Sequence, residues 1–193
     1  MRDVVPTGLT ADSAFLFARM TELTLEWLGV APGARVLDVA SIMAMIDSEL
    51  EESLPVGRFV AAAAARLHPD SGLVEVVAAG LGAVAVLPSD PREPAVVIEP
   101  MRPPLALGRG ERVEALHMKL TPGDALVILS DGYTDPLTGA GQRSIQPVLS
   151  VLPRAVSAET LAHAIDDHAA RAGAGDDDQT MVIVKRGPIN RRG

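Results

Sequence analysis

The pattern of apolar residues predicts an α+β fold in which an antiparallel sheet is covered by helices. Between residues 59 and 130 the apolar runs are short and separated by turn sequences, so the strands are grouped along the chain. Helical patterns lie before and after this group. Grouped strands favour antiparallel pairing with helices packed on the sheet. With 193 residues and 48% hydrophobic content, the chain is large enough to bury a core.

The N-terminal part predicts a helix, a strand and a second helix. Apolar residues of 14–28 fall mostly on one helical stripe, and 35–39 is a short apolar run that follows a Pro-Gly turn. Residues 42–53 carry apolar side chains at i, i+3, i+4 and i+8, which predicts a helix. Pro55 and Gly57 are expected to end this helix, because both residue types break helices.

Turn sequences in the middle of the chain predict hairpins. "HPDSG" at 68–72 separates two apolar runs, and "PSDPREP" at 88–94 separates two more. The alanine-rich run before the first turn would also suit a helix on composition, but the turn and the Val-rich run after it favour a hairpin. The expected strands are 59–67, 73–79, 83–87, 95–100, 113–120 and 125–130.

The C-terminal part predicts two helices and a last strand. "GQRSIQPVLSVLPRA" is expected to form a helix and a loop. Ser157 suits the N-cap of a further helix, which Gly173 would end. In "DDDQTMVIVKR" a polar stretch of aspartates leads into a last expected strand, and the tail 188–193 is expected to be disordered.

The composition excludes several classes of function. A net charge of −8 disfavours nucleic acids and anionic membrane surfaces as partners. The absence of cysteine excludes disulfides, thiolate zinc sites and a cysteine nucleophile. The sequence has no long uncharged apolar run and no signal-peptide pattern, so a cytoplasmic location is expected.

Two acidic clusters are candidates for a metal site. Asp131 with Asp135 follows one expected strand, and Asp176, Asp177 and Asp178 precede the last one. If the two strands are neighbours, these carboxylates meet at one edge of the sheet, where a divalent cation would offset their repulsion. Carboxylate oxygens favour magnesium or manganese. The alternative, which composition alone favours, is that Asp-Gly and Asp-Pro mark ordinary turns and that the three aspartates form a solvated loop.

Other residues show weaker patterns. The four histidines have no metal-ligand spacing with a matching third ligand. Arg102 and Arg109 could meet a phosphate, but both are expected to lie on the surface. "ILSDGY" does not fit the nucleophile motif G-x-S-x-G.

Three segments, in this order and spacing, resemble the SpoIIE/RsbU branch of the PPM-type metal-dependent protein phosphatases. They are "RFVAAAAARLHPDSGLVEVVAAG", "HMKLTPGDALVILSDGYTD" and "GAGDDDQTMVIVKR". The resemblance covers about Ile42 to Arg186. It implies a β-sandwich flanked by helices, with two Mn²⁺ or Mg²⁺ ions at one end. It also implies that Asp131 and Asp177 are metal ligands, with Asp178 at the neighbouring motif position. The family's catalyst is a metal-activated water, without a covalent enzyme intermediate.

The chain also departs from this family pattern. "VLDVAS" places Asp38 where the family has an acidic motif, but the Gly-His-Gly turn that should follow is missing. The fold is therefore expected to be incomplete on its N-terminal side, with two, one or no metal ions and Asp38 as a further candidate ligand. The front segment "LTLEWLGVAPGARVLDVAS" instead resembles the start of a class I methyltransferase, without its glycine-rich loop. The expected division is 1–41 of uncertain origin, 42–187 as the phosphatase domain, and the tail 188–193.

The resemblance implies a phosphoserine/phosphothreonine protein phosphatase domain. Its implied substrate is a phosphorylated protein, such as an anti-sigma-factor antagonist. Because the recognisable metal shell is incomplete, the alternative is a catalytically impaired or inactive phosphatase-like module with a binding or regulatory role. A methyltransferase fragment is a more distant alternative, and the strand-rich C-terminal part speaks against it.

Overall fold

A computed structural model describes residues 38–187, except 69, 81–82, 99–101, 108–112, 139–144 and 174–177. The described residues belong to one compact unit that begins at Asp38. The helix expected in 14–28 and the tail 188–193 lie outside the described residues. Within this part of the chain, no helix is long and apolar enough to cross a membrane.

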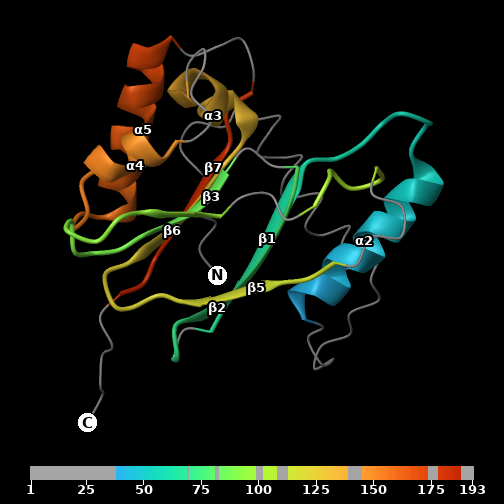
Figure 1. Ribbon diagram of the computed structural model, residues 1–193, viewed down its shortest axis with the longest axis horizontal. Helices are drawn as coiled ribbons and strands as arrows, with labels where there is room; N and C mark the ends of the chain where they lie inside the picture. The colour runs from blue at the N-terminus through green and yellow to red at the C-terminus, as the bar shows by residue number, and fades with distance from the viewer. Residues whose placement is uncertain are drawn as a thin grey trace, which may run out of the picture. The chain divides into compact units, whose positions relative to one another are not determined.

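The described strands form two antiparallel sheets, so the predicted α+β class is confirmed (Figure 1). One sheet has the order β1-β2-β5 and the other has the order β4-β3-β6-β7. Consecutive strands β1 and β2 form a hairpin, as do β3 and β4, because turn sequences separate them as expected. The strands are β1 Ala62–Leu67, β2 Leu73–Ala79, β3 Ala83–Leu87, β4 Val96–Ile98, β5 Leu116–Lys119, β6 Ala125–Leu129 and β7 Met181–Lys185.

The two sheets pack face to face around an aliphatic core. Alternate residues of β2 point inward, and Val74 and Val76 are completely buried against Val84 of β3 and Leu126 of β6. The intervening residues of β2 face the other way, as the period of two in a strand requires. The structure is therefore a β-sandwich, and both outer faces of the sandwich carry helices.

Helix α2 (Val39–Ser53) covers the outer face of the first sheet. Val39 and Met43 pack with Val77 of β2 and with Leu105. The helix begins three residues earlier than the sequence predicted, because the Asp38 side chain caps it. Val39, expected in a strand at 35–39, is thus the first residue of this helix.

Three helices cover the outer face of the second sheet: α3 (Asp131–Thr138), α4 (Gln146–Val151) and α5 (Ala158–Ala172) (Figure 1). Ser157 caps α5 and Gly173 ends it in the left-handed conformation, as predicted. The alternative interpretation of Asp-Gly and Asp-Pro as ordinary turns is wrong, because this segment forms α3. The Ser130 carbonyl accepts the Tyr133 and Thr134 backbone N–H groups and so begins a helix.

A buried ion pair joins α2 to the connection between β4 and β5. Arg102 donates to Asp47 at 2.5 Å, and the Ala106 backbone N–H donates to the same carboxylate at 2.7 Å. Arg102 was expected on the surface, but only 6% of it is exposed.

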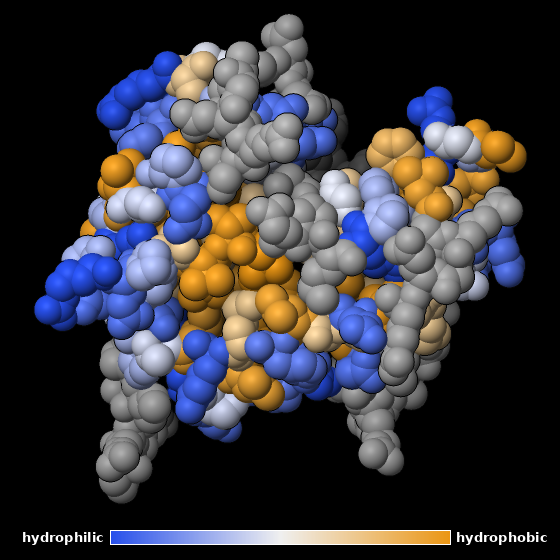
Figure 2. All heavy atoms as spheres, viewed as in Figure 1, coloured by the Kyte–Doolittle hydropathy of each residue, from blue (hydrophilic) through white to orange (hydrophobic). Residues whose placement is uncertain are grey.

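Figure 2 shows hydrophobic residues gathered between α4–α5 on one side and α2 on the other, where the sheets lie.

Candidate functional site

The end of β6 and the start of β7 lie side by side. Leu129 pairs with Met181 at the end of the ladder, and the next hydrogen bond runs from the Ser130 N–H to the Thr180 carbonyl at 2.9 Å. This pairing brings Asp131 and Asp178 to the same end of the second sheet. The strands that lead to the two acidic segments are therefore neighbours, which is the condition that the predicted shared edge required. Of the second cluster, Asp178 lies within the described residues.

Side chains add further contacts between the two segments. The Ser130 hydroxyl accepts from the Thr180 N–H at 2.9 Å and donates to the Asp178 carbonyl at 3.3 Å. The Gln179 amide donates to the Gly132 carbonyl at 3.0 Å. Asp131 is thus flanked on both sides by residues that are bonded to the strand entering β7.

Asp131 is the first residue of α3, and its side chain is exposed. A carboxylate at this position is favoured by the partial positive charge of the helix N-terminus. The three residues that follow it, Gly132 to Thr134, are buried, so the backbone that carries Asp131 is packed. Asp178 is exposed as well. Both carboxylates are therefore accessible to a dissolved cation.

The Asp38 side chain caps helix α2 in this structure. Its two carboxylate oxygens accept hydrogen bonds from the Ser41 backbone N–H at 2.8 Å and from the Ser41 hydroxyl at 2.9 Å. These bonds hold the pKa of Asp38 below its ordinary value.

The described donor set matches a metal site in part. Asp131 and Asp178 supply carboxylate oxygens, the ligand type that Mg²⁺ and Mn²⁺ prefer. Asp177, the other predicted ligand of this cluster, lies outside the described residues. Within the described ranges, no group of three or more acidic or histidine side chains is placed to hold a metal ion.

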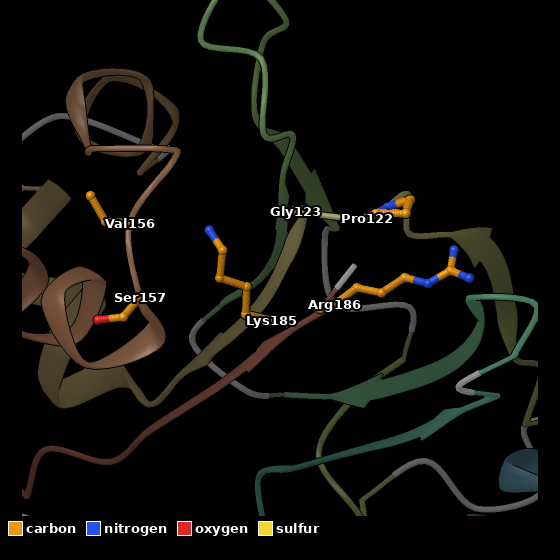
Figure 3. A pocket seen from close by; sticks show the side chains of 7 residues that line it. Pro122, Gly123, Val156, Ser157, Lys185 and Arg186 are labelled. Carbon is orange, nitrogen blue, oxygen red and sulfur yellow. The ribbon is translucent and has the colours of Figure 1, made fainter. Parts of the chain in front are cut away.

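A surface pocket of about 470 Å³ lies at the other end of β7 (Figure 3). Its basic side chains are already engaged in hydrogen bonds. Lys185 donates to the Arg154 carbonyl at 2.8 Å, and Arg186 donates to the carbonyls of Leu120 and Asp70. The pocket lies at the opposite end of β7 from the acidic candidate site. Its two cationic side chains stabilise the loops around it by bonding to their carbonyls.

Sequence reasoning did not single out Gln179 or the Ser130 hydroxyl. The available signal was Pro136, five residues after Asp131. A proline inside a helix leaves a carbonyl four residues earlier without its usual donor, so another group must approach it. In this structure that carbonyl belongs to Gly132, and the group is Gln179.

Comparisons with known proteins place the fold. The family model described as Stage II sporulation protein E (SpoIIE) matches residues 13–187, so the match also includes most of the segment 1–41. The PP2C phosphatase domain of SpoIIE from Bacillus subtilis, solved with a fragment of its regulatory domain, has a TM-score of 0.67 at 17% identity, over 94% of this chain and 52% of that one. Curated proteins, in contrast, give no sequence match to this chain.

Two further solved structures are similar. The RsbU and RsbW domains of a Mycobacterium tuberculosis protein give a TM-score of 0.66 at 18% identity, over 94% of this chain and 49% of that one. RsbX in complex with magnesium gives a TM-score of 0.60 at 14% identity, over 92% of this chain and 75% of that one. The chain spans about half the length of the first two structures. These likenesses show that the fold is that of a PP2C phosphatase domain.

Proposed function

From the premise that this chain belongs to the SpoIIE family, we propose that it is a metal-dependent phosphatase of phosphoserine and phosphothreonine in proteins. The observation that supports this most is the meeting of Asp131 and Asp178 at one end of β6 and β7 in a PP2C fold. Residues 42–187 would form the phosphatase domain, and a cytoplasmic location belongs to the same proposal.

The proposed metal ligands are Asp131 and Asp177, with Asp178 and Asp38 as further candidates. The exposed carboxylates of Asp131 and Asp178 have the oxygen chemistry that Mn²⁺ or Mg²⁺ requires, and the relative RsbX was solved with magnesium. A bound ion of this kind supplies the Lewis acidity that ionises water near neutral pH and offsets charge on phosphoryl oxygens.

The chain's own residues would hold this site open and in place. The packed first turn of α3 fixes Asp131, while the exposure of both aspartates lets a phosphorylated side chain on another protein approach. In the reaction, a water oxygen bonds to phosphorus, the P–O bond to the serine or threonine breaks, and a proton from the water passes to the leaving side-chain oxygen, which becomes a hydroxyl. The absence of cysteine agrees with direct attack by water.

The proposed substrate is a phosphorylated regulatory protein, in particular an anti-sigma-factor antagonist. The family membership supports this class, and one structural relative carries an RsbU domain together with an RsbW domain. The acidic balance of the chain, with a net charge of −8, disfavours nucleic acid as an alternative partner.

A catalytically impaired or inactive module is the second candidate function. It is favoured by Asp38, whose carboxylate caps α2 directly, so that the helix begins where the family has a Gly-His-Gly turn. A site that lacks this ligand would hold fewer ions than the binuclear mechanism needs. Such a chain would bind a phosphoprotein or a cation without turnover.

Hydrolysis of p-nitrophenyl phosphate and of a phosphothreonine peptide with added Mn²⁺ separates the two candidates. The proposal expects turnover that chelation abolishes and that falls to background in Asp131→Asn. Asp167→Asn, on the exposed side of α5, should keep full activity. Thermal stabilisation by Mn²⁺ without turnover would establish the inactive module instead. If the chain shows neither turnover nor stabilisation by Mn²⁺, both acidic clusters are solvated loops without a metal-binding role.

A further inference from the structure

Ser130 extends the β6–β7 ladder with its side chain. In an antiparallel pair, the Ser130 carbonyl would accept the Thr180 N–H. That carbonyl is instead turned toward α3, where it accepts the N–H groups of Tyr133 at 3.1 Å and Thr134 at 3.2 Å. The Thr180 N–H therefore bonds to the Ser130 hydroxyl at 2.9 Å. A hydroxyl at position 130 thus keeps the second hydrogen bond of the Ser130–Thr180 pair while the Ser130 carbonyl begins the helix.

On the other side of Asp131, Gln179 supplies a hydrogen-bond donor that helix α3 lacks. In a regular α-helix the Gly132 carbonyl accepts the N–H of residue 136. Residue 136 is proline, which has no N–H to donate. The Gln179 side-chain amide donates to this carbonyl at 3.0 Å. Because Gly132 is buried, a carbonyl left without this donor would be costly.

Both compensating bonds come from the segment that carries the second acidic cluster. Ser130 and Gly132 are the neighbours of Asp131, and their partners Thr180 and Gln179 directly follow Asp178. The Ser130 hydroxyl also donates to the Asp178 carbonyl at 3.3 Å. The backbone on each side of Asp131 is therefore fastened to the backbone that follows Asp178.

We propose that Ser130 and Gln179 are positioning residues, which hold Asp131 against the 178–180 segment and thereby set the affinity for a divalent cation. This inference rests on the proposed function. Neither residue is a proposed ligand; each acts through the backbone of Asp131. Groups that hydrogen-bond directly to a metal ligand change affinity by about 10–100-fold when they are removed. Ser130 and Gln179 act on the proposed ligand Asp131 through the adjoining residues.

The chain offers matched controls for both contacts. Gln146 also donates its amide to a backbone carbonyl, that of Ala95 at 2.5 Å, and Ser150 donates its hydroxyl to the Gln146 carbonyl at 2.7 Å. Both lie on α4, away from the acidic segments. Gln146→Met and Ser150→Ala therefore remove the same kinds of bond as Gln179→Met and Ser130→Ala, without touching the candidate site.

The experiment measures Mn²⁺ affinity by calorimetry, and urea unfolding in the presence of a chelator. Gln179→Met and Ser130→Ala should weaken Mn²⁺ binding by about tenfold or more. Ser130→Thr, which keeps the hydroxyl, should bind like the wild-type chain, as should both controls. The metal-free stability of Gln179→Met and Gln146→Met should fall by similar amounts, so that lost stability alone does not explain a change in affinity.

Two results would overturn the inference in distinguishable ways. If the wild-type chain binds Mn²⁺ and Gln179→Met binds it equally well, the positioning role is wrong while the proposed function stands. If the wild-type chain binds no Mn²⁺, the proposed function fails and the inference fails with it. Should Ser130→Ala not fold, Gln179→Asn decides the question, because its shorter amide cannot reach the Gly132 carbonyl.

Discussion

Replacement of Asp47 by alanine is expected to destabilise the fold by about 3–5 kcal/mol, because it leaves a buried arginine without a partner. Asp47 is 7% exposed and Arg102 is 6% exposed. The Nε and Nη1 atoms of Arg102 already lack hydrogen-bond partners, and Nη2 bonds to Asp47 at 2.5 Å. Removal of the carboxylate would therefore leave all three guanidinium nitrogens unpaired in the interior.

A second bond adds to this loss. The Ala106 N–H donates to the other Asp47 oxygen at 2.7 Å, and Ala106 has a left-handed φ of 68° that is unfavourable for a residue with a side chain. Without Asp47, this strained residue would lose the hydrogen bond that its own N–H makes. Since a domain of this size is typically stable by about 5–15 kcal/mol, the substitution removes a large share of the free energy of unfolding.

Urea unfolding followed by far-ultraviolet circular dichroism measures the effect. Asp167→Ala is the control, because Asp167 pairs with Arg171 at 3.8 Å on the surface, with 70% and 73% of the side chains exposed, and should cost less than about 0.5 kcal/mol. The double variant Asp47→Leu/Arg102→Met should recover much of the loss, since it removes both charges. A cost for Asp47→Ala within about 1 kcal/mol of the control would refute the reasoning.

Two further predictions concern Tyr133 and a pair of glycines. Burial and the bond to Asp166 raise the pKa of Tyr133, the chain's single tyrosine, above its ordinary value of 10.0. The stability that Tyr133 contributes should thus be complete below about pH 10 and be lost as the pH rises further, a dependence absent from Tyr133→Phe. Tyrosinate absorbance that titrates alike in folded and urea-unfolded chain would contradict this. Gly72→Ala should destabilise more than Gly173→Ala by about 1 kcal/mol or more. Both glycines have positive φ, but a Cβ at 72 would lie 2.3 Å from the Leu120 carbonyl, whereas nothing lies within 4 Å at 173. Equal losses in denaturant midpoint would show that backbone conformation alone decides the cost.

Local sequence patterns predicted the elements whose causes are local. The turn "PSDPREP" and the apolar runs on either side of it were enough to predict β3 and β4, and Ser157 with Gly173 predicted both ends of α5. The buried role of Arg102 depends on Asp47, which lies 55 residues away, so no local pattern could reveal it. A charged residue is by default expected at the surface, and only tertiary structure shows the exception.

The candidate site was predicted unevenly for the same reason. Asp131 and Asp178 could be expected at the same end of the sheet once β6 and β7 were taken as neighbours, and β6 does pair with β7. Helix α3 could not be predicted from the sequence, because Gly132 and Pro136 both have low intrinsic helix propensity. For Asp38 a local signal was available: a serine three residues after an aspartate is compatible with an N-cap bond, which the structure contains.

Helix α3, which carries Asp131, depends on contacts with other elements for its stability. A helix of eight residues that contains glycine and proline cannot form by itself, so it depends on partners in two layers. The Gln179 amide holds it from the β7 side, and the Tyr133 hydroxyl holds it from the α5 side through Asp166 at 2.5 Å. Asp131 therefore keeps its position only while sheet and helices are packed together. A change at α5 that moves Asp166 should therefore shift the position of Asp131 through the first turn of α3, although Asp166 does not contact the Asp131 carboxylate.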